Sequence, residues 1–194
     1  MRVIGGEFRS RRLKTVRGLE TRPTPDRLRE SLFDVLAPRI QDCVFLDAYA
    51  GTGAVGIEAL SRGAQRAVFI EKHGPAVRMI RENLKALGLE SRAAVVQGSA
   101  AVCLTRFVAD IVFLDPPYDH EGEYEVALRA LGTKPPALAI AQHAVRFRLE
   151  DAYGPLRRVR ILTQGDNALS FYEPVSPEAQ IEGSLESRCG TAPR

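Results

Sequence analysis

The sequence lacks an apolar run long enough to cross a bilayer, which argues against an integral membrane protein. Its opening residues, MRVIGGEFRSRRLK, also lack the apolar core of a signal peptide. Cysteine is scarce, and the three that are present are too scattered for a disulfide framework or a metal site. His73, His120 and His143 likewise share no metal-ligand spacing. We therefore expect a cytoplasmic protein with no membrane partner and no bound metal.

Length and charge indicate how the chain is organised. Its 194 residues suit one domain with a small appendage. Residues 1–30 hold nine lysines and arginines against four acids, a net charge of +5 in a chain whose total is +3. Such a cluster often meets a phosphate backbone, although a solvated basic start is the plainer alternative. Residues 176–194 are polar and lack any period, so we expect a disordered tail there.

Apolar runs alternate with helical patterns from residue 44 onward. The runs predict five strands, at 44–48, 66–71, 93–97, 110–115 and 137–141. This alternation is typical of a parallel sheet covered on both faces. VRILTQ and ALSFYEPV then flank Gly165-Asp166-Asn167 and predict an antiparallel hairpin. The fold class is therefore α/β, with a mostly parallel seven-stranded sheet and an antiparallel C-terminal hairpin at its edge.

The N-terminal region predicts a hairpin followed by a helix. Gly5-Gly6 marks a turn or bulge, so residues 1–22 are expected to form a small basic β-hairpin extension of a main domain at 23–175. The stretch TRPTPDRLRESLFDVLA then starts a helix, with Thr24 as its cap and Pro25 at the first helical position. Periodicity places Arg29 off the apolar face of that helix.

A glycine-rich turn follows the first strand of the alternating region. Gly51, Gly53 and Gly56 fit G-x-G-x-x-G, and Glu71 lies 20 residues after Gly51 at the end of the second strand, where it would reach ribose hydroxyls. Asp47, four residues before Gly51, would repel a pyrophosphate and favour a cationic ligand. S-adenosylmethionine has an ammonium, a sulfonium and a ribose but no phosphate, so it fits better than a dinucleotide. Asp47 acting only as a cap of the loop is compatible with this interpretation.

The stretch FLDPPYD, residues 113–119, ends the fourth strand with an acid and two prolines. Methyl transfer to an exocyclic aromatic amine is favoured by two acceptors on the amine hydrogens, because positive charge develops on that nitrogen. The Asp115 carboxylate and the Pro116 carbonyl can be those acceptors, and Tyr118 can stack on the base. The base must be unpaired or flipped to reach them. The plainer alternative is a rigid loop with a stacked tyrosine.

Four motifs together carry a family resemblance. RVIGGEFRSRRL, RPTPDRLRESLF, LDAYAGTGAVGIEALSRGA and LDPPYD, in this order and near these spacings, resemble the bacterial 16S ribosomal RNA guanine-N2 methyltransferases of the RsmD type. The resemblance covers about residues 1 to 175. It implies a Rossmann-like class I methyltransferase domain that uses S-adenosylmethionine. It also implies a partner, the 16S ribosomal RNA in the small subunit or its late assembly intermediate, and we expect a monomer.

The resemblance assigns roles by position. It implies cofactor contacts by Asp47, Ala48, Gly51, Thr52, Gly53, Glu71, Lys72 and Ser99. It implies that the guanine amine is handled by Asp115, Pro116, Pro117 and Tyr118. It implies that the RNA is met by Arg9, Arg11, Arg12, Lys14, Arg22 and Arg27. One position departs from the family pattern: Ser99 stands where an acid often pairs with the adenine amine, and a hydroxyl accepts that bond more weakly.

Three other functions stay open on the sequence alone. A DNA adenine-N6 methyltransferase shares the D-P-P-Y tetrapeptide, but the chain has no evident room for a domain that reads base edges. A dinucleotide oxidoreductase shares the glycine pattern, and Asp47 counts against it. A non-catalytic RNA-binding assembly factor would share the basic N-terminus, but it would not need Asp115 to Tyr118.

Overall fold

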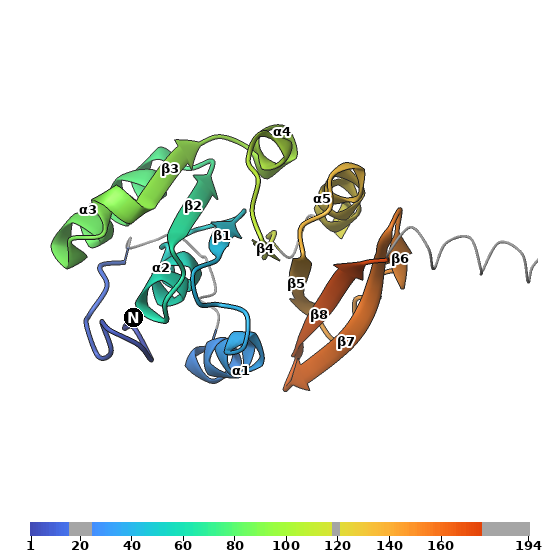
Figure 1. Ribbon diagram of the computed structural model, residues 1–194, viewed down its shortest axis with the longest axis horizontal. Coiled ribbons are helices and arrows are strands. Elements are labelled where there is room, and N and C mark those ends of the chain that lie inside the picture. The colour runs from blue at the N-terminus through green and yellow to red at the C-terminus, as the bar shows by residue number, and fades with distance from the viewer. Residues whose placement is uncertain (16–24, 118–120, 176–194) are drawn as a thin grey trace, which may run out of the picture.

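The computed structural model describes residues 1–15, 25–117 and 121–175, and a single eight-stranded sheet forms its centre (Figure 1). The strands are β1 Val44–Asp47, β2 Arg66–Glu71, β3 Ala93–Gln97, β4 Ile111–Leu114, β5 Leu138–Ala144, β6 Ala152–Tyr153, β7 Leu156–Gln164 and β8 Asn167–Pro174. The helices are α1 Asp26–Leu36, α2 Ala54–Ser61, α3 Gly74–Leu87, α4 Ala100–Cys103 and α5 Glu121–Thr133, with short 3-10 turns η1 Glu90–Arg92 and η2 Leu104–Arg106.

The strand order is β3-β2-β1-β4-β5-β8-β7-β6. Strands β1 to β5 pair in parallel, whereas β8, β7 and β6 pair antiparallel. This confirms the predicted parallel sheet with an antiparallel hairpin at its edge. The sheet has one strand more than expected, because the two-residue β6 pairs with the start of β7. So short a strand leaves no periodic pattern in the sequence.

Helices cover both faces of the sheet. On one face α4 and α5 pack over Leu46, Val112 and Leu114, in a buried cluster that extends to β8. On the other face α1, α2 and α3 pack over two clusters that include Phe45 and Phe69. The parallel strands are therefore buried on both sides, which explains why they read as continuous apolar runs. Among the described residues, no helix is long and apolar enough to cross a membrane.

The first helix differs in detail from its prediction. It begins at Asp26, so Pro25 occupies the N-cap position and not the first helical position, and Thr24 lies outside the described residues. Leu28, Leu32, Phe33 and Leu36 form its buried apolar face. Arg29, which was placed off that face, is fully buried, and this prediction was wrong. Periodicity could not show that another segment of chain covers Arg29.

That covering segment is the N-terminal stretch, residues 1–15. Its two arms pair antiparallel through one bridge between Arg2 and Arg12, and the Val3 N–H donates to the Arg11 carbonyl at 3.0 Å. The two arms are therefore joined by a single bridge and form no named strands over residues 1–15. The β-hairpin extension over residues 1–22 stays a prediction, because residues 16–22 lie outside the described residues. Gly6, with a φ of 76°, lies at the turn as the Gly5-Gly6 signal predicted.

Candidate functional site

The glycine turn and the Asp115 stretch begin at neighbouring strand ends. Strands β1 and β4 are adjacent, and Asp47 is level with Phe113. The Ala48 N–H donates to the Phe113 carbonyl at 3.0 Å, so the two strand exits are tied together. Sheet order reverses direction between β1 and β4, and ligands of open α/β sheets bind at such a switch. The structure thus brings together the two motifs that the sequence singled out.

The glycines have physical reasons to be glycine. Gly53 has a φ of 78° at the N-cap of α2, a conformation that other residues adopt at a cost. A Cβ on Gly56 would lie 2.3 Å from the Phe69 ring, so α2 can approach β2 only with glycine there. The turn is therefore compact, with Gly51 and Thr52 half-buried, and the lack of side chains at its glycines suits close approach of a ligand to the backbone.

Glu71 lies beside this loop, as its spacing predicted. Its Oε2 accepts the Gly51 N–H at 2.8 Å, and its Oε1 accepts the His73 N–H at 2.7 Å. The side chain is only slightly exposed. Each carboxylate oxygen has a second lone pair, so Glu71 can still accept from ribose hydroxyls. A carboxylate with acceptor capacity at this position fits a nucleoside ligand.

Asp47 is almost fully buried at the end of β1. Its Oδ2 accepts the Gly56 N–H at 3.1 Å, so it does cap the loop, as the plainer interpretation held. Burial raises the pKa of Asp47 to about 7, and this exceeds the opposing effect of the Gly56 hydrogen bond. Its contact with a cofactor stays a prediction. What the structure adds is a carboxylate that shapes the glycine loop.

The remaining predicted cofactor residues lie around the same strand ends. Ala48 is buried, Thr52 is half-buried, and Lys72 and Ser99 are exposed. The Gly98 N–H donates to the Glu71 carbonyl at 3.0 Å, which holds the end of β3 beside the end of β2. The Ser99 side chain makes no capping bond to α4, so its hydroxyl is not used there.

The predicted amine site follows β4. Asp115 is half-buried, Pro116 is buried and Pro117 is exposed. Asp115 has interactions of its own in this conformation. Tyr118 lies outside the described residues, so its stacking role stays a prediction.

Sequence reasoning missed Tyr49, which is partly buried within the glycine loop and packs against the cluster beneath α4 and α5. Burial and the Glu123 carboxylate on α5 both raise the pKa of Tyr49. The loop after β1 is therefore in contact with the helix that follows Asp115. The aromatic residue inside the motif was the available signal, but only the fold shows its partner.

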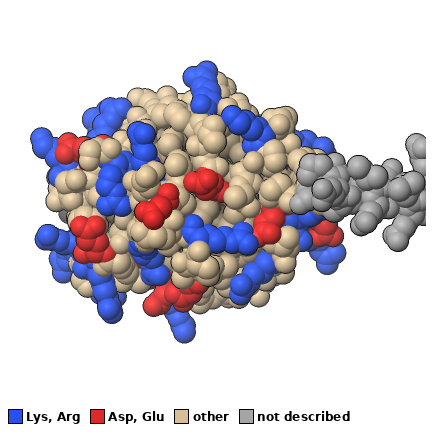
Figure 2. All heavy atoms as spheres, viewed as in Figure 1, with Lys and Arg blue, Asp and Glu red and all other residues tan. Residues whose placement is uncertain are grey.

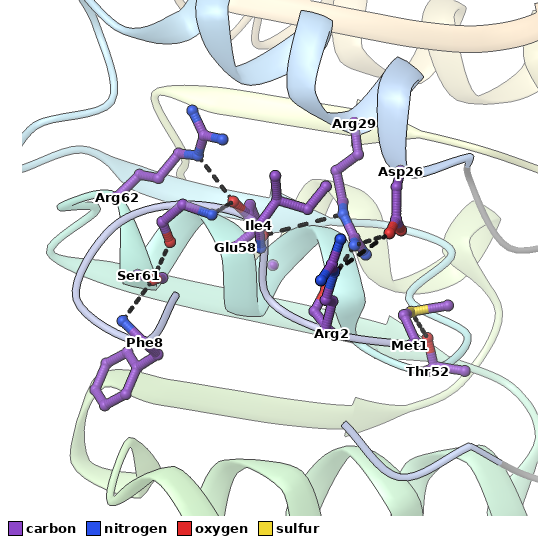
Figure 3. Close-up of polar contacts among 12 residues, drawn as sticks. Met1, Arg2, Ile4, Phe8, Asp26, Arg29, Thr52, Glu58, Ser61 and Arg62 are labelled. Carbon is purple, nitrogen blue, oxygen red and sulfur yellow. Dashed lines mark hydrogen bonds and ion pairs between the residues drawn. The ribbon is translucent and has the colours of Figure 1, made fainter. Parts of the chain in front are cut away.

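Side chains of α2 anchor the N-terminal segment (Figure 3). Glu58 accepts the Ile4 N–H at 2.8 Å on Oε2 and the Gly5 N–H at 2.7 Å on Oε1. Ser61 accepts the Phe8 N–H at 2.9 Å and donates to the Gly5 carbonyl at 2.6 Å. The segment is thus docked on the same helix that begins at the glycine loop, a link that the sequence did not reveal.

The buried Arg29 completes this anchor (Figure 3). Its Nη2 donates to the Arg2 carbonyl at 2.7 Å and to Asp26 Oδ1 at 3.1 Å, while its Nε lies 4.0 Å from Glu58 Oε2. On the other side of Glu58, the Arg62 Nε donates to Oε1 at 2.8 Å. Burial lowers the pKa of Arg29, and the nearby carboxylates of Glu58 and Asp26 oppose that effect.

The predicted RNA-binding residues of this region differ in how they are held. Arg9, Arg11, Arg12 and Arg27 are exposed, and none lies within 4.0 Å of a carboxylate among the described residues. Lys14 is also exposed, but it pairs with Glu82 at 2.9 Å. Figure 2 shows Lys and Arg side chains projecting around the side of the molecule where Figure 1 has α3 and the N-terminal segment. Arg22 lies outside the described residues.

Two curated relatives are similar to this chain. A Bacillus subtilis protein named "Putative rRNA methyltransferase YlbH" is 35% identical over 188 residues, which cover 89% of this chain and 98% of the relative. Ribosomal RNA small subunit methyltransferase D of Escherichia coli is 42% identical over 120 residues, which cover 61% of this chain and 60% of that protein. The resemblance predicted from the four motifs is confirmed.

Solved structures agree with the fold. "Putative methyltransferase yhhF from Escherichia coli" superposes with a TM-score of 0.78 at 35% identity, over 90% of this chain and 97% of that one. A Pyrococcus horikoshii protein described as a putative RNA methyltransferase has a TM-score of 0.70 at 19% identity, which supports the class I methyltransferase fold alone. The model of the family described as "Conserved hypothetical protein 95" matches residues 1–173. This chain therefore belongs to that family.

Proposed function

We propose that this protein transfers a methyl group from S-adenosylmethionine to the N2 amine of a guanine in 16S ribosomal RNA of the small subunit. One observation carries the proposal: the glycine loop with Glu71 and the Asp115-Pro116 pair leave adjacent parallel strands at the switch point of the sheet. One relative is named a ribosomal RNA small subunit methyltransferase and another a putative rRNA methyltransferase, and both names support this class of reaction and substrate.

The cofactor would lie across the ends of β1, β2 and β3. Glu71 would accept from ribose hydroxyls, and the backbone around Gly51 and Gly53 would approach the ligand closely. Ser99 would accept from the adenine amine through a hydroxyl that caps no helix. S-adenosylmethionine, when bound there, supplies an electrophilic methyl group on a sulfonium.

The protein's contribution to chemistry would lie after β4. The N2 amine of guanine is planar because its lone pair is delocalised into the ring. Asp115 and the Pro116 carbonyl would accept its two hydrogens and favour a pyramidal nitrogen whose lone pair points at the methyl carbon. The cofactor would supply the methyl group and leave as S-adenosylhomocysteine, while Asp115 and the Pro116 carbonyl would hold the nitrogen until its extra proton leaves to water. Tyr118 would stack on the base and fix its plane.

The basic N-terminal segment would hold the RNA. Its exposed arginines lie on a segment docked to α2, the helix that begins at the cofactor loop. Phosphates bound by Arg9, Arg11 and Arg12 would therefore be held at a fixed position relative to the glycine loop.

The test is methyl transfer to small subunits isolated from cells that lack this enzyme. Purified protein and tritiated S-adenosylmethionine should label a single guanine in 16S ribosomal RNA, located by nuclease mapping and shown to be N2-methylguanosine by mass spectrometry. Label on duplex DNA and none on small subunits would favour an adenine-N6 enzyme. Tight cofactor binding with no label on any nucleic acid would overturn the proposal.

A further inference from the structure

Gln142, near the carboxyl end of β5, has an unusual side chain. It is 1% exposed, and its Oε1 is buried without a hydrogen-bond partner among the residues that the structure describes. A buried acceptor left without a donor costs free energy, and such groups in folded proteins call for an explanation. Its main chain is well held, because the Tyr124 hydroxyl donates to the Gln142 carbonyl at 2.7 Å. The unsatisfied oxygen therefore sits on a fixed backbone.

The register of the sheet places Gln142 beside the proposed amine site. Strands β4 and β5 pair in parallel, and their last registered pair is Leu114 with Ala141. The residues that follow this pair are Asp115, directly after the end of β4, and Gln142, within β5. Gln142 comes two residues after Ile140, and Asp115 comes two residues after Phe113. Ile140 and Phe113 belong to the same buried cluster, so strand alternation places Gln142 on the face of the sheet that Phe113 occupies, beside the point where Asp115 leaves β4.

Guanine presents three adjacent donors on its Watson–Crick edge, the N1–H and the two N2 hydrogens. This inference rests on the proposed function, in which Asp115 and the Pro116 carbonyl accept the two N2 hydrogens. The N1–H needs a third acceptor close to Asp115. Adenine has an acceptor at N1 in place of a donor, so the same oxygen would disfavour it.

We infer that Gln142 selects guanine by accepting the N1–H on its Oε1. The outermost torsion of a glutamine side chain is soft, so the amide can turn toward a base seated against Asp115. Contact with the base would then satisfy the oxygen that has no partner among the described residues. A site with such an acceptor rejects a substrate that lacks the matching donor, because the acceptor would stay unpaired.

The test uses 2-aminopurine, which keeps the N2 amine but has no hydrogen on N1. Small subunits are reconstituted with 16S RNA carrying guanosine or 2-aminopurine riboside at the mapped target, and kcat/KM is measured for each. The wild-type protein should prefer guanine by at least about 100-fold. Gln142→Met, which keeps the side-chain length without the amide, should lower that preference by about tenfold or more. Gln142→Asn moves the acceptor oxygen away from the base and should lower the preference for guanine as well. This variant serves as the test if Gln142→Met fails to fold.

Two further variants separate selection from structure. Gln142→Glu keeps acceptor oxygens at the same reach, so its preference for guanine should stay within about threefold of wild type. Gln164 also has a buried unpartnered Oε1, but it lies at the end of β7, two strands outward from β5, so Gln164→Met should leave the preference unchanged. An unchanged preference in Gln142→Met, with methylation of guanine intact, would overturn this inference and leave the proposed function standing. Absence of methylation by the wild-type protein would overturn the proposed function itself.

Discussion

The strand-end site, made of the glycine loop, Glu71 and Asp115, and the N-terminal segment both rely on buried carboxylates that accept backbone N–H groups, but the two regions balance charge differently. Glu58, which holds the N-terminal segment, lies between the guanidinium groups of Arg29 and Arg62. Asp47, which shapes the glycine loop, has no lysine or arginine within 4.0 Å among the described residues, and its pKa is raised to about 7.

The difference separates anchoring from function. A carboxylate flanked by cations is a stable structural contact that holds a segment in place. A buried carboxylate with no cation beside it lowers the stability of the fold, and such destabilising groups are found most often at ligand-binding sites. Glu58 thus serves the docking of the N-terminal segment, while Asp47 serves the strand-end site. Changes in the two regions should therefore have different consequences.

The largest effect on stability should come from Glu58→Ala. It would remove the carboxylate that lies between the guanidinium groups of Arg29 and Arg62, leaving Arg29 with Asp26 alone, and would deprive the Ile4 and Gly5 N–H groups of their acceptor. Breaking a buried pair in this way costs about 3–5 kcal/mol in the free energy of unfolding, measured by urea titration. Glu82→Ala, which removes the exposed pair with Lys14, should cost less than about 1 kcal/mol. Equal losses in the two variants would show that Glu58 is not an anchor.

The largest effect on chemistry should come from Asp115→Ala. It removes one of the two acceptors proposed for the amine, so kcat should fall by about 100- to 1,000-fold. Affinity for S-adenosylmethionine and for small subunits should stay within about twofold, because those contacts lie elsewhere. Asp110→Ala is the matched control at the opposite end of the same strand, where the carboxylate accepts the Val44 N–H at 2.8 Å. Its kcat should be unchanged, and a comparable loss there would refute a specific role for Asp115.

A smaller effect should appear in the pH dependence of stability. Asp47 has a pKa of about 7 in the folded state, above its ordinary value of 3.8, so the folded protein holds this proton more tightly than the unfolded chain does. The resulting stabilisation is complete below about pH 4 and is lost as pH rises through 7. Asp47→Asn can still accept the Gly56 N–H but cannot ionise. Relative to wild type, it should gain on the order of 1–3 kcal/mol between pH 4 and pH 8, measured by urea unfolding. A constant difference across that range would contradict the raised pKa.

Much of the fold could be predicted from the sequence, because its signals are local. The apolar runs of β1, β2 and β4 are short, bounded and buried on both faces. Motif order was enough to place the glycine loop beside Asp115, since parallel strands end at the same edge.

The rest depended on contacts between distant parts of the chain. Arg29 looked solvent-facing because its partners, the Arg2 carbonyl and Glu58, come from two other segments. Gln142 gave no signal in the sequence, since only the register of β4 against β5 puts it beside Asp115. The two-residue β6 is shorter than any periodic pattern.

The smallest effect should come from the exposed arginines of the N-terminal segment. If Arg11 and Arg12 each neutralise one phosphate, changing both to alanine should reduce the slope of log affinity against log salt by about 1.5 to 2. Affinity for small subunits at 0.15 M salt should fall by roughly tenfold. The kcat at saturating substrate should stay unchanged, because Arg11 and Arg12 lie on the N-terminal segment and not at the strand ends. Arg157 and Arg160 on β7 are exposed too and serve as the matched control pair. The same change in slope for both pairs would mean that binding follows overall charge, and that docking of the segment on α2 has no part in placing the RNA.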